Sequence, residues 1–253
     1  MENLDKLANL LISSKSAVFF GGAGVSTESG IPDFRSENGI NKAKQTYGYR
    51  PEVLLSRSFF DVHPEVFFRY CKENLIINDV QPNSAHIALA ELEQLGKLAG
   101  VVTQNIDGLH QAAGSKVVYE LHGAIRKQYC MVCSERYSLD YIFDPANCKN
   151  GIIPICQKCN GIVRPDIVLY EEELDNMVIG GAITAISKAD LLIVGGTSLA
   201  VYPAAGLLRY FTGQNLVVIN KTATSADNMA SLVIHGAIGA VFNKVMEKIN
   251  SDT

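Results

Sequence analysis

Short apolar runs alternate with amphipathic segments along most of the chain. Runs of the kind that form strands buried on both faces lie at residues 17–20, 98–103, 117–121, 167–169, 191–194 and 216–219. Apolar residues at helical spacing lie at residues 3–13, 83–95, 175–187, 203–211 and 237–249. Alternating strands and helices are typical of α/β proteins, so the sequence predicts a doubly wound, mostly parallel sheet.

Two segments interrupt this alternation. Residues 41–76 contain no clear strand but offer a helix that begins at Pro64, with Phe67, Phe68, Cys71 and Leu75 on its apolar side. Residues 126–164 are rich in Cys, Gly, Pro and Asn. We therefore expect two insertions that form a smaller domain, and a main domain made of residues 1–40, 77–125 and 165–253.

Composition excludes several classes of protein. The 253 residues are 47% hydrophobic and 19% charged, which is not the composition of a disordered chain. Twenty-two Lys and Arg against 26 Asp and Glu give a net charge of −4, which argues against nucleic-acid binding through bulk charge. Glu2 and Asp5 argue against a secretory signal, and Gly and Pro interrupt the uncharged run 191–208. The sequence thus predicts neither a nucleic-acid partner nor a membrane partner.

A glycine-rich turn, Gly22–Ser26, follows the first predicted strand. Such a turn lets a backbone approach a phosphate, although a tight turn without a ligand is an equal alternative. The ordinary dinucleotide fingerprint fails, because Thr27 stands where the third glycine belongs. The chain continues instead into Gly30–Arg35, which holds an acid, an aromatic ring and a guanidinium together. An ordinary nicotinamide dehydrogenase is therefore disfavoured.

Polar residues also follow the other predicted strands. Gln104, Asn105 and Asp107 come after residues 98–103, and His122 comes after residues 117–121. Ligands of open α/β sheets bind at this edge, and an imidazole there suits a general base. A polar turn and a structural histidine are the alternatives. Hydroxyls and an amide follow the last two predicted strands, at Gly195–Ser198 and Asn220, and each is weak evidence alone.

Five of the six cysteines lie between residues 130 and 159, which is not a disulfide framework and indicates a reducing, cytoplasmic location. Two C-x-x-C pairs, Cys130 with Cys133 and Cys156 with Cys159, predict a closed structural zinc site. A redox dithiol is the alternative. Cys148 has no C-x-x-C partner and could substitute as a ligand.

Taken together, these motifs resemble the sirtuin family of NAD-dependent protein deacylases. The strings Gly-Ile-Pro-Asp-Phe-Arg at 30–35 and Gln-Asn-Ile-Asp at 104–107 carry the resemblance, which extends from about residue 5 to about residue 245. It implies a Rossmann-like large domain, a small domain held together by a zinc that takes no part in the reaction, and a cleft between the two domains where NAD meets acyl-lysine. Acyl transfer to ADP-ribose, with release of nicotinamide, is the implied reaction.

The resemblance also implies roles for individual residues. His122 matches the base, and Asn105 and Asp107 match the residues that hold the nicotinamide ribose and carboxamide. Other NAD contacts are implied for Gly22, Ala23, Thr27, Asp33, Phe34, Arg35, Gln104, Ile106, Gly196, Thr197, Ser198, Asn220, Lys221 and Ile238. The peptide should add as a β-strand between two segments, namely Val168, Leu169, Tyr170 and Glu171 on one side and Leu199, Ala200 and Val201 on the other.

Acyl preference follows from a motif that this chain lacks. Family members that prefer acidic acyl groups carry Tyr-x-x-Arg, whereas here Glu73 stands three residues after Tyr70. We therefore expect acetyl or longer neutral acyl groups in preference to succinyl. ADP-ribosyl transfer or NAD hydrolysis on the same scaffold is the alternative activity, and an idle NAD-sensing module is the alternative class. The sequence leaves the oligomeric state open.

Overall fold

A six-stranded parallel sheet forms the larger part of the computed structural model, which describes residues 2–33 and 36–251. The strand order is β11-β10-β9-β1-β2-β3. The strands are β1 (Ala17–Gly21), β2 (Leu98–Thr103), β3 (Val118–Glu120), β9 (Leu191–Gly195), β10 (Asn215–Asn220) and β11 (Leu232–His235). This confirms the predicted α/β architecture, to which β11 adds an edge strand that the apolar runs did not indicate.

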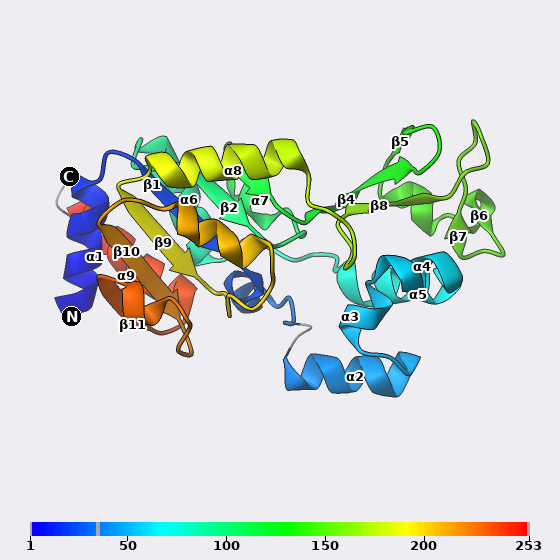
Figure 1. Cartoon of the computed structure of the whole chain (residues 1–253), viewed down its shortest axis with the longest axis horizontal. Coiled ribbons are helices and arrows are strands. Elements are labelled where there is room, and N and C mark those ends of the chain that lie inside the picture. Colours follow the sequence, from blue (N-terminus) through cyan, green and yellow to red (C-terminus); the bar gives the residue numbers. More distant parts are fainter. Residues whose placement is uncertain (1, 34–35, 252–253) are drawn as a thin grey trace.

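Helices cover both faces of the sheet. Packed on one face are α1 (Glu2–Ser13), α6 (Ser84–Gln94) and α9 (Ile238–Ser251), and on the other α8 (Asn176–Lys188) and the 3₁₀ helix η6 (Ala204–Tyr210). Phe19 of β1 points to the first layer and Phe20 to the second, which explains why this strand is apolar throughout. Figure 1 shows α1 and α9 together at the end of the molecule where both termini lie.

A smaller unit lies at the other end of the molecule (Figure 1). Its helices are α2 (Glu37–Tyr47), α3 (Pro51–Leu54), α4 (Arg57–Val62) and α5 (Pro64–Tyr70), followed by the π turn η3 (Cys71–Leu75). Its strands are β4 (Gly123–Cys130), β5 (Arg136–Tyr137), β6 (Cys148–Lys149), β7 (Ile153–Pro154) and β8 (Val163–Ile167). Phe67 and Phe68 share one hydrophobic core with Ile125 and Val163, so distant segments of the chain pack together here.

Short helical turns occupy several connections. They are η1 (Ala23–Val25), η2 (Thr27–Ser29), α7 (Leu109–Ala113), η4 (Asp140–Phe143), η5 (Pro145–Asn147) and η7 (Asp227–Met229). No helix of the described ranges is long and apolar enough to cross a membrane.

The strand predicted at residues 167–169 in the main sheet is wrong. Ile167 instead ends β8, which pairs antiparallel with β4 in a three-stranded sheet of the smaller unit. The apolar run suggested a strand of the main sheet because both of its end residues are buried. Ile167 and Leu169 are, however, buried in the hydrophobic core of the smaller unit. The predicted helix at residues 203–211 is the 3₁₀ helix η6. The division into domains stays a prediction, and two of its boundaries, 125/126 and 164/165, fall inside β4 and β8.

Candidate active site

A cavity of about 260 Å³ brings together the predicted base and part of the predicted cofactor and peptide residues. Ala23, Asp33 and His122 line it, as do the four residues Gln104–Asp107 that follow β2. The predicted peptide segment Val168–Glu171 and Val201 complete a further part of the wall. The cavity thus lies where the carboxyl ends of β1, β2 and β3 face the smaller unit, as expected for an open α/β sheet.

Glycines after β1 and β9 let two loops touch. Gly24 N donates to Gly196 O at 2.8 Å, and a Cβ on Gly24 would lie 2.8 Å from that same oxygen. A Cβ on Gly22 would lie 2.9 Å from Thr197 Cβ. Gly22 and Gly24 are therefore needed for the close contact between the loops, whether or not a phosphate also approaches.

A serine joins the polar residues of the β1 and β2 loops. Asn105 Nδ2 donates to Ser26 Oγ at 3.0 Å, and Ser26 Oγ donates to Asp107 Oδ2 at 2.7 Å. Leu109 N donates to the other carboxylate oxygen at 2.9 Å. Burial raises the pKa of Asp107, and the hydrogen bonds from Leu109 and Ser26 partly oppose that shift. The motif at 22–26 includes Ser26, but its bridging role was not predicted.

His122 follows β3 and is oriented by a backbone carbonyl. Its Nδ1 lies 2.9 Å from Gln104 O, and because a carbonyl only accepts, Nδ1 carries the hydrogen. The neutral ring then has its basic lone pair on Nε2. The next residue, Gly123, has φ +76° and a Cβ there would lie 2.1 Å from Asp166 O, so the turn that presents His122 needs glycine.

The predicted adenosine and phosphate residues surround the β9 and β10 ends. Gln104 Nε2 donates to Thr197 Oγ1 at 3.2 Å, and Leu199 N donates to the same hydroxyl at 3.2 Å. Asn220 ends β10 and its side chain donates to Thr222 O at 2.9 Å. These contacts order the loops, and of these residues only Gln104 lines the cavity.

Several other residues predicted to contact NAD or the peptide do not line the cavity. Thr27 Oγ1 donates to Gly24 O at 2.9 Å, so its hydroxyl closes its own turn. The Ile238 side chain is buried in the core beneath the sheet, which leaves only its backbone for a ligand. Exposed positions are occupied by Ser198, Ala200 and Lys221. Phe34 and Arg35 lie outside the described residues.

The four C-x-x-C sulfurs form one cluster, in which every pair lies within 4.8 Å. Ligands at about 2.3 Å on a tetrahedral zinc would be about 3.8 Å apart. Cys130 and Cys159 Sγ are 3.4 Å apart, and Cys133 and Cys156 Sγ are 3.6 Å apart. The cluster therefore fits a structural zinc. Cys148 is not in the cluster; its Sγ lies 3.4 Å from Asp144 O.

Backbone amides complete the cysteine cluster. Val132 N donates to Cys130 Sγ and Lys158 N donates to Cys156 Sγ, each at 3.4 Å. Both bonds arise two residues after the first cysteine of a pair, so each C-x-x-C forms a similar turn. Such bonds stabilise thiolates that hold a metal.

Comparison with known proteins decides the family. The model of the Sir2 family matches residues 22–203. A Clostridium acetobutylicum protein named NAD-dependent protein deacetylase is 55% identical over 246 residues, which are 97% of this chain and 99% of that protein. This chain belongs to the Sir2 family. The sirtuin resemblance of the sequence is thereby confirmed.

Solved Sir2 structures share the fold of the whole chain. A Sir2 complex with p53 peptide and NAD⁺ is 38% identical, with a TM-score of 0.87 over 99% of each chain. A Sir2 structure bound to acetylated peptide is 37% identical, with a TM-score of 0.85 over 97% of this chain and 98% of that one.

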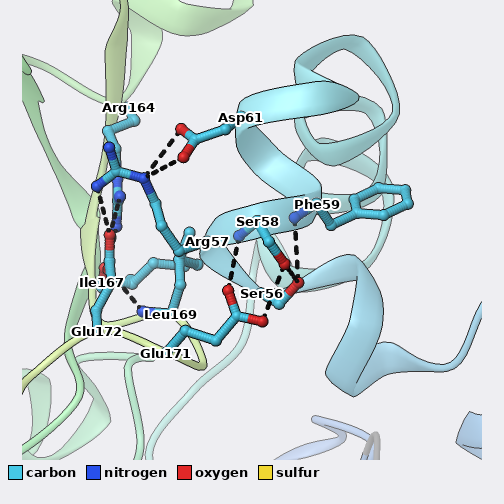
Figure 2. A network of polar contacts seen from close by, with 10 residues as sticks. All are labelled: Ser56, Arg57, Ser58, Phe59, Asp61, Arg164, Ile167, Leu169, Glu171 and Glu172. Atoms are coloured by element: carbon cyan, nitrogen blue, oxygen red, sulfur yellow. Dashed lines mark hydrogen bonds and ion pairs between the residues drawn. The ribbon is translucent and has the colours of Figure 1, made fainter.

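An ion pair supports the predicted peptide segment, Val168–Glu171, of this Sir2 chain (Figure 2). Arg164, only 1% exposed, donates to both oxygens of Glu172 at 2.6 and 2.9 Å and to Ile167 O at 2.5 Å. Glu172 also accepts from Leu169 N at 2.9 Å. Burial raises the pKa of Glu172, but Arg164 and the Leu169 amide outweigh this and its pKa lies below the ordinary value. Sequence reasoning missed this pair.

Proposed function

We propose that this chain, an NAD-dependent protein deacetylase of the Sir2 family, uses His122 as its general base in the cavity that follows β1, β2 and β3. One observation carries the proposal: the imidazole of His122 and the Asn105–Ser26–Asp107 network line the same cavity as the segment Val168–Glu171. A base, ribose-binding groups and a peptide site are the parts that acyl transfer from lysine needs.

The donor set suits NAD. The buried amides of Gln104 and Asn105 and the half-buried carboxylate of Asp107 are suited to a carboxamide and to ribose hydroxyls. When bound, NAD supplies the ADP-ribosyl group that accepts the acyl group and releases nicotinamide. His122 Nε2 takes the proton of a ribose hydroxyl, and Gln104 O stabilises the imidazolium by accepting from Nδ1. Asn105 and Asp107 orient that hydroxyl.

The acyl-lysine peptide is proposed to bind as a strand between Val168–Glu171 and Leu199–Val201. Backbone pairing on this segment reads little sequence, so recognition rests on the acylated lysine. Val168 N donates to His122 O at 3.0 Å, which ties the peptide segment directly to the base. Zinc on the four cysteines stabilises the smaller unit and takes no part in the reaction. Cytoplasmic location and the absence of a nucleic-acid partner stay predictions.

Nicotinamide release from NAD, with and without an acetyl-lysine peptide, tests the proposal. A matched peptide with unmodified lysine is the control. We expect release only with the acetylated peptide, and equal amounts of deacetylated peptide and nicotinamide. Release that does not depend on peptide would instead indicate NAD hydrolysis or ADP-ribosyl transfer.

A further inference from the structure

The peptide segment ends in a turn with an unfavourable residue at its third position. Glu172 N donates to Leu169 O at 3.1 Å, which closes the turn 169–172. Glu171 has φ +76°, a left-handed conformation that turns of this kind usually give to glycine. Non-glycine residues persist in this conformation only where the surrounding structure holds them.

The side chain of Glu171 supplies such a restraint (Figure 2). Its Oε2 accepts from Ser58 N at 2.8 Å and its Oε1 accepts from Ser58 Oγ at 2.9 Å. Ser58 is the second residue of α4, so the carboxylate also lies at the positive end of a short helix. Among the described residues, Glu171 forms no ion pair with a cation within 4.0 Å, so these neutral donors are its partners.

Backbone bonds align the same two segments. Arg57 N donates to Tyr170 O at 3.0 Å, and Tyr170 N donates to Leu55 O at 2.9 Å. At the other end of the segment, Val168 N is bonded to His122 O. The stretch from Val168 to Glu171 is therefore fixed to the base at one end and to α4 at the other.

We propose that Glu171 is a positioning residue for the peptide substrate. Its carboxylate, hydrogen-bonded to Ser58, holds the backbone of Glu171 in the left-handed conformation. This conformation shapes the turn 169–172 and so sets the direction of the Val168–Tyr170 edge. A peptide strand on that edge then carries its acyl-lysine toward His122. This role rests on the proposed function, because it requires the peptide to bind on this segment.

Four single variants separate the clamp from other roles. Glu171→Ala removes the clamp and keeps the unfavourable φ, whereas Glu171→Gly removes the clamp but tolerates the same φ. Ser58→Ala removes one of the two hydrogen bonds, and its backbone donor remains. Glu173→Ala is the control, because Glu173 is an exposed acid two residues away that does not line the cavity. Steady-state deacetylation is measured while the peptide and NAD concentrations are varied separately.

We expect the peptide KM to rise about tenfold in Glu171→Ala and about threefold in Glu171→Gly, with kcat and the NAD KM within about twofold of wild type. In the double variant Ser58→Ala/Glu171→Ala, the rise in peptide KM should be smaller than the two single effects combined, because Ser58 acts through its bond to Glu171. Glu173→Ala should match wild type. This split between peptide KM and kcat would not arise from general loss of folded protein.

Equal rises in Glu171→Ala and Glu171→Gly would overturn the proposal, because they would indicate direct contact of the carboxylate with peptide. An unchanged peptide KM in Glu171→Ala would overturn it as well. Failure of the proposed function is distinguishable from both, since wild type itself would then show no peptide-dependent release of nicotinamide.

Discussion

Ser26 and Asp107, 81 positions apart in the chain, share a hydrogen bond of 2.7 Å at the floor of the cavity. The bond joins the loop after β1 to the loop after β2, and Asn105 bonds to the same serine. The hydroxyl donates to the carboxylate and accepts from the amide, so the two side chains are held in fixed relative orientation.

Removing this hydroxyl should change both rate and pH dependence. In Ser26→Ala the charged form of Asp107 loses a donor, so its pKa, already raised by burial, rises further. We expect kcat/KM to fall about tenfold at neutral pH and its acid limb to move to higher pH. The pH profile of kcat/KM checks this, with Asp107→Asn as the control that removes the titrating group. An acid limb at the wild-type pH would contradict the role given to Asp107.

Metal analysis of two cysteine variants tests the zinc site. Cys159→Ser removes a member of the four-sulfur cluster, whereas Cys148→Ser alters a thiol outside it. We expect about one zinc per chain in wild type and Cys148→Ser, and loss of zinc with loss of stability in Cys159→Ser. Loss of zinc from Cys148→Ser would show that Cys148 is a ligand.

Much of the larger part of the fold is predictable from the sequence, because strands buried on both faces are apolar throughout. Residues 17–20 and 191–194 are examples, and both lie in the centre of the sheet. The edge strand β11 was missed because runs of three apolar residues do not identify strands of the main sheet: the run 232–234 lies in β11, whereas the equally short run 167–169 does not belong to this sheet. β8 escaped because Pro165 and Asp166 interrupt its apolar pattern.

Asn105, Asp107 and His122 were picked out because they follow predicted strands, and all three line the cavity, while their roles stay predictions. The supporting contacts of the site were not predictable. The clamp between Glu171 and Ser58 joins positions 113 apart, and the left-handed φ of Glu171 leaves no sign in the sequence, where glycine would have done so. The phosphate interpretation of Gly24 was incomplete, because its contact with Gly196 depends on the pairing of β1 with β9.

Acid should destabilise the protein through two buried histidines. His86 and His110 have ring centroids 4.7 Å apart. Burial lowers the pKa of His86 to about 4, and burial with repulsion from His86 lowers that of His110 to about 3. An unfolded histidine titrates near about 6.5, so the unfolded state binds more protons below that pH. The free energy of unfolding therefore keeps its neutral-pH value above about pH 6.5, and at pH 5 it is lower by about 2 kcal/mol per histidine.

Urea unfolding of wild type and His110→Leu at pH 7 and pH 5 measures this effect. For each protein, the unfolding free energy at pH 5 is subtracted from that at pH 7, and the two differences are compared. This subtraction removes the effect that the substitution has at pH 7. About 2 kcal/mol less should be lost in the variant. An equal loss in both proteins would mean that other groups cause the acid sensitivity.

The charge of the cavity supports the predicted preference for neutral acyl groups. Glu52, Glu171 and Glu172 line it, and no Lys or Arg does so in the described part of the wall. Glu73, at the position of the motif's arginine, instead accepts a hydrogen bond from Tyr47 OH. We expect kcat/KM for an acetyl-lysine peptide to exceed that for the matched succinyl-lysine peptide by about tenfold or more. Faster turnover of the succinyl peptide would refute this.

The most direct test of the account is the turnover of acetyl-lysine peptide by His122→Ala, with His235→Ala as an exposed-histidine control. Loss of the base should lower kcat by about 10²–10⁴-fold. Binding of peptide and of NAD, measured by titration, should remain, because the backbone hydrogen bond from Val168 N to the carbonyl of residue 122 is retained. The control should keep wild-type turnover. If His122→Ala kept at least half of the wild-type kcat, His122 would not be the base and the central claim would be wrong.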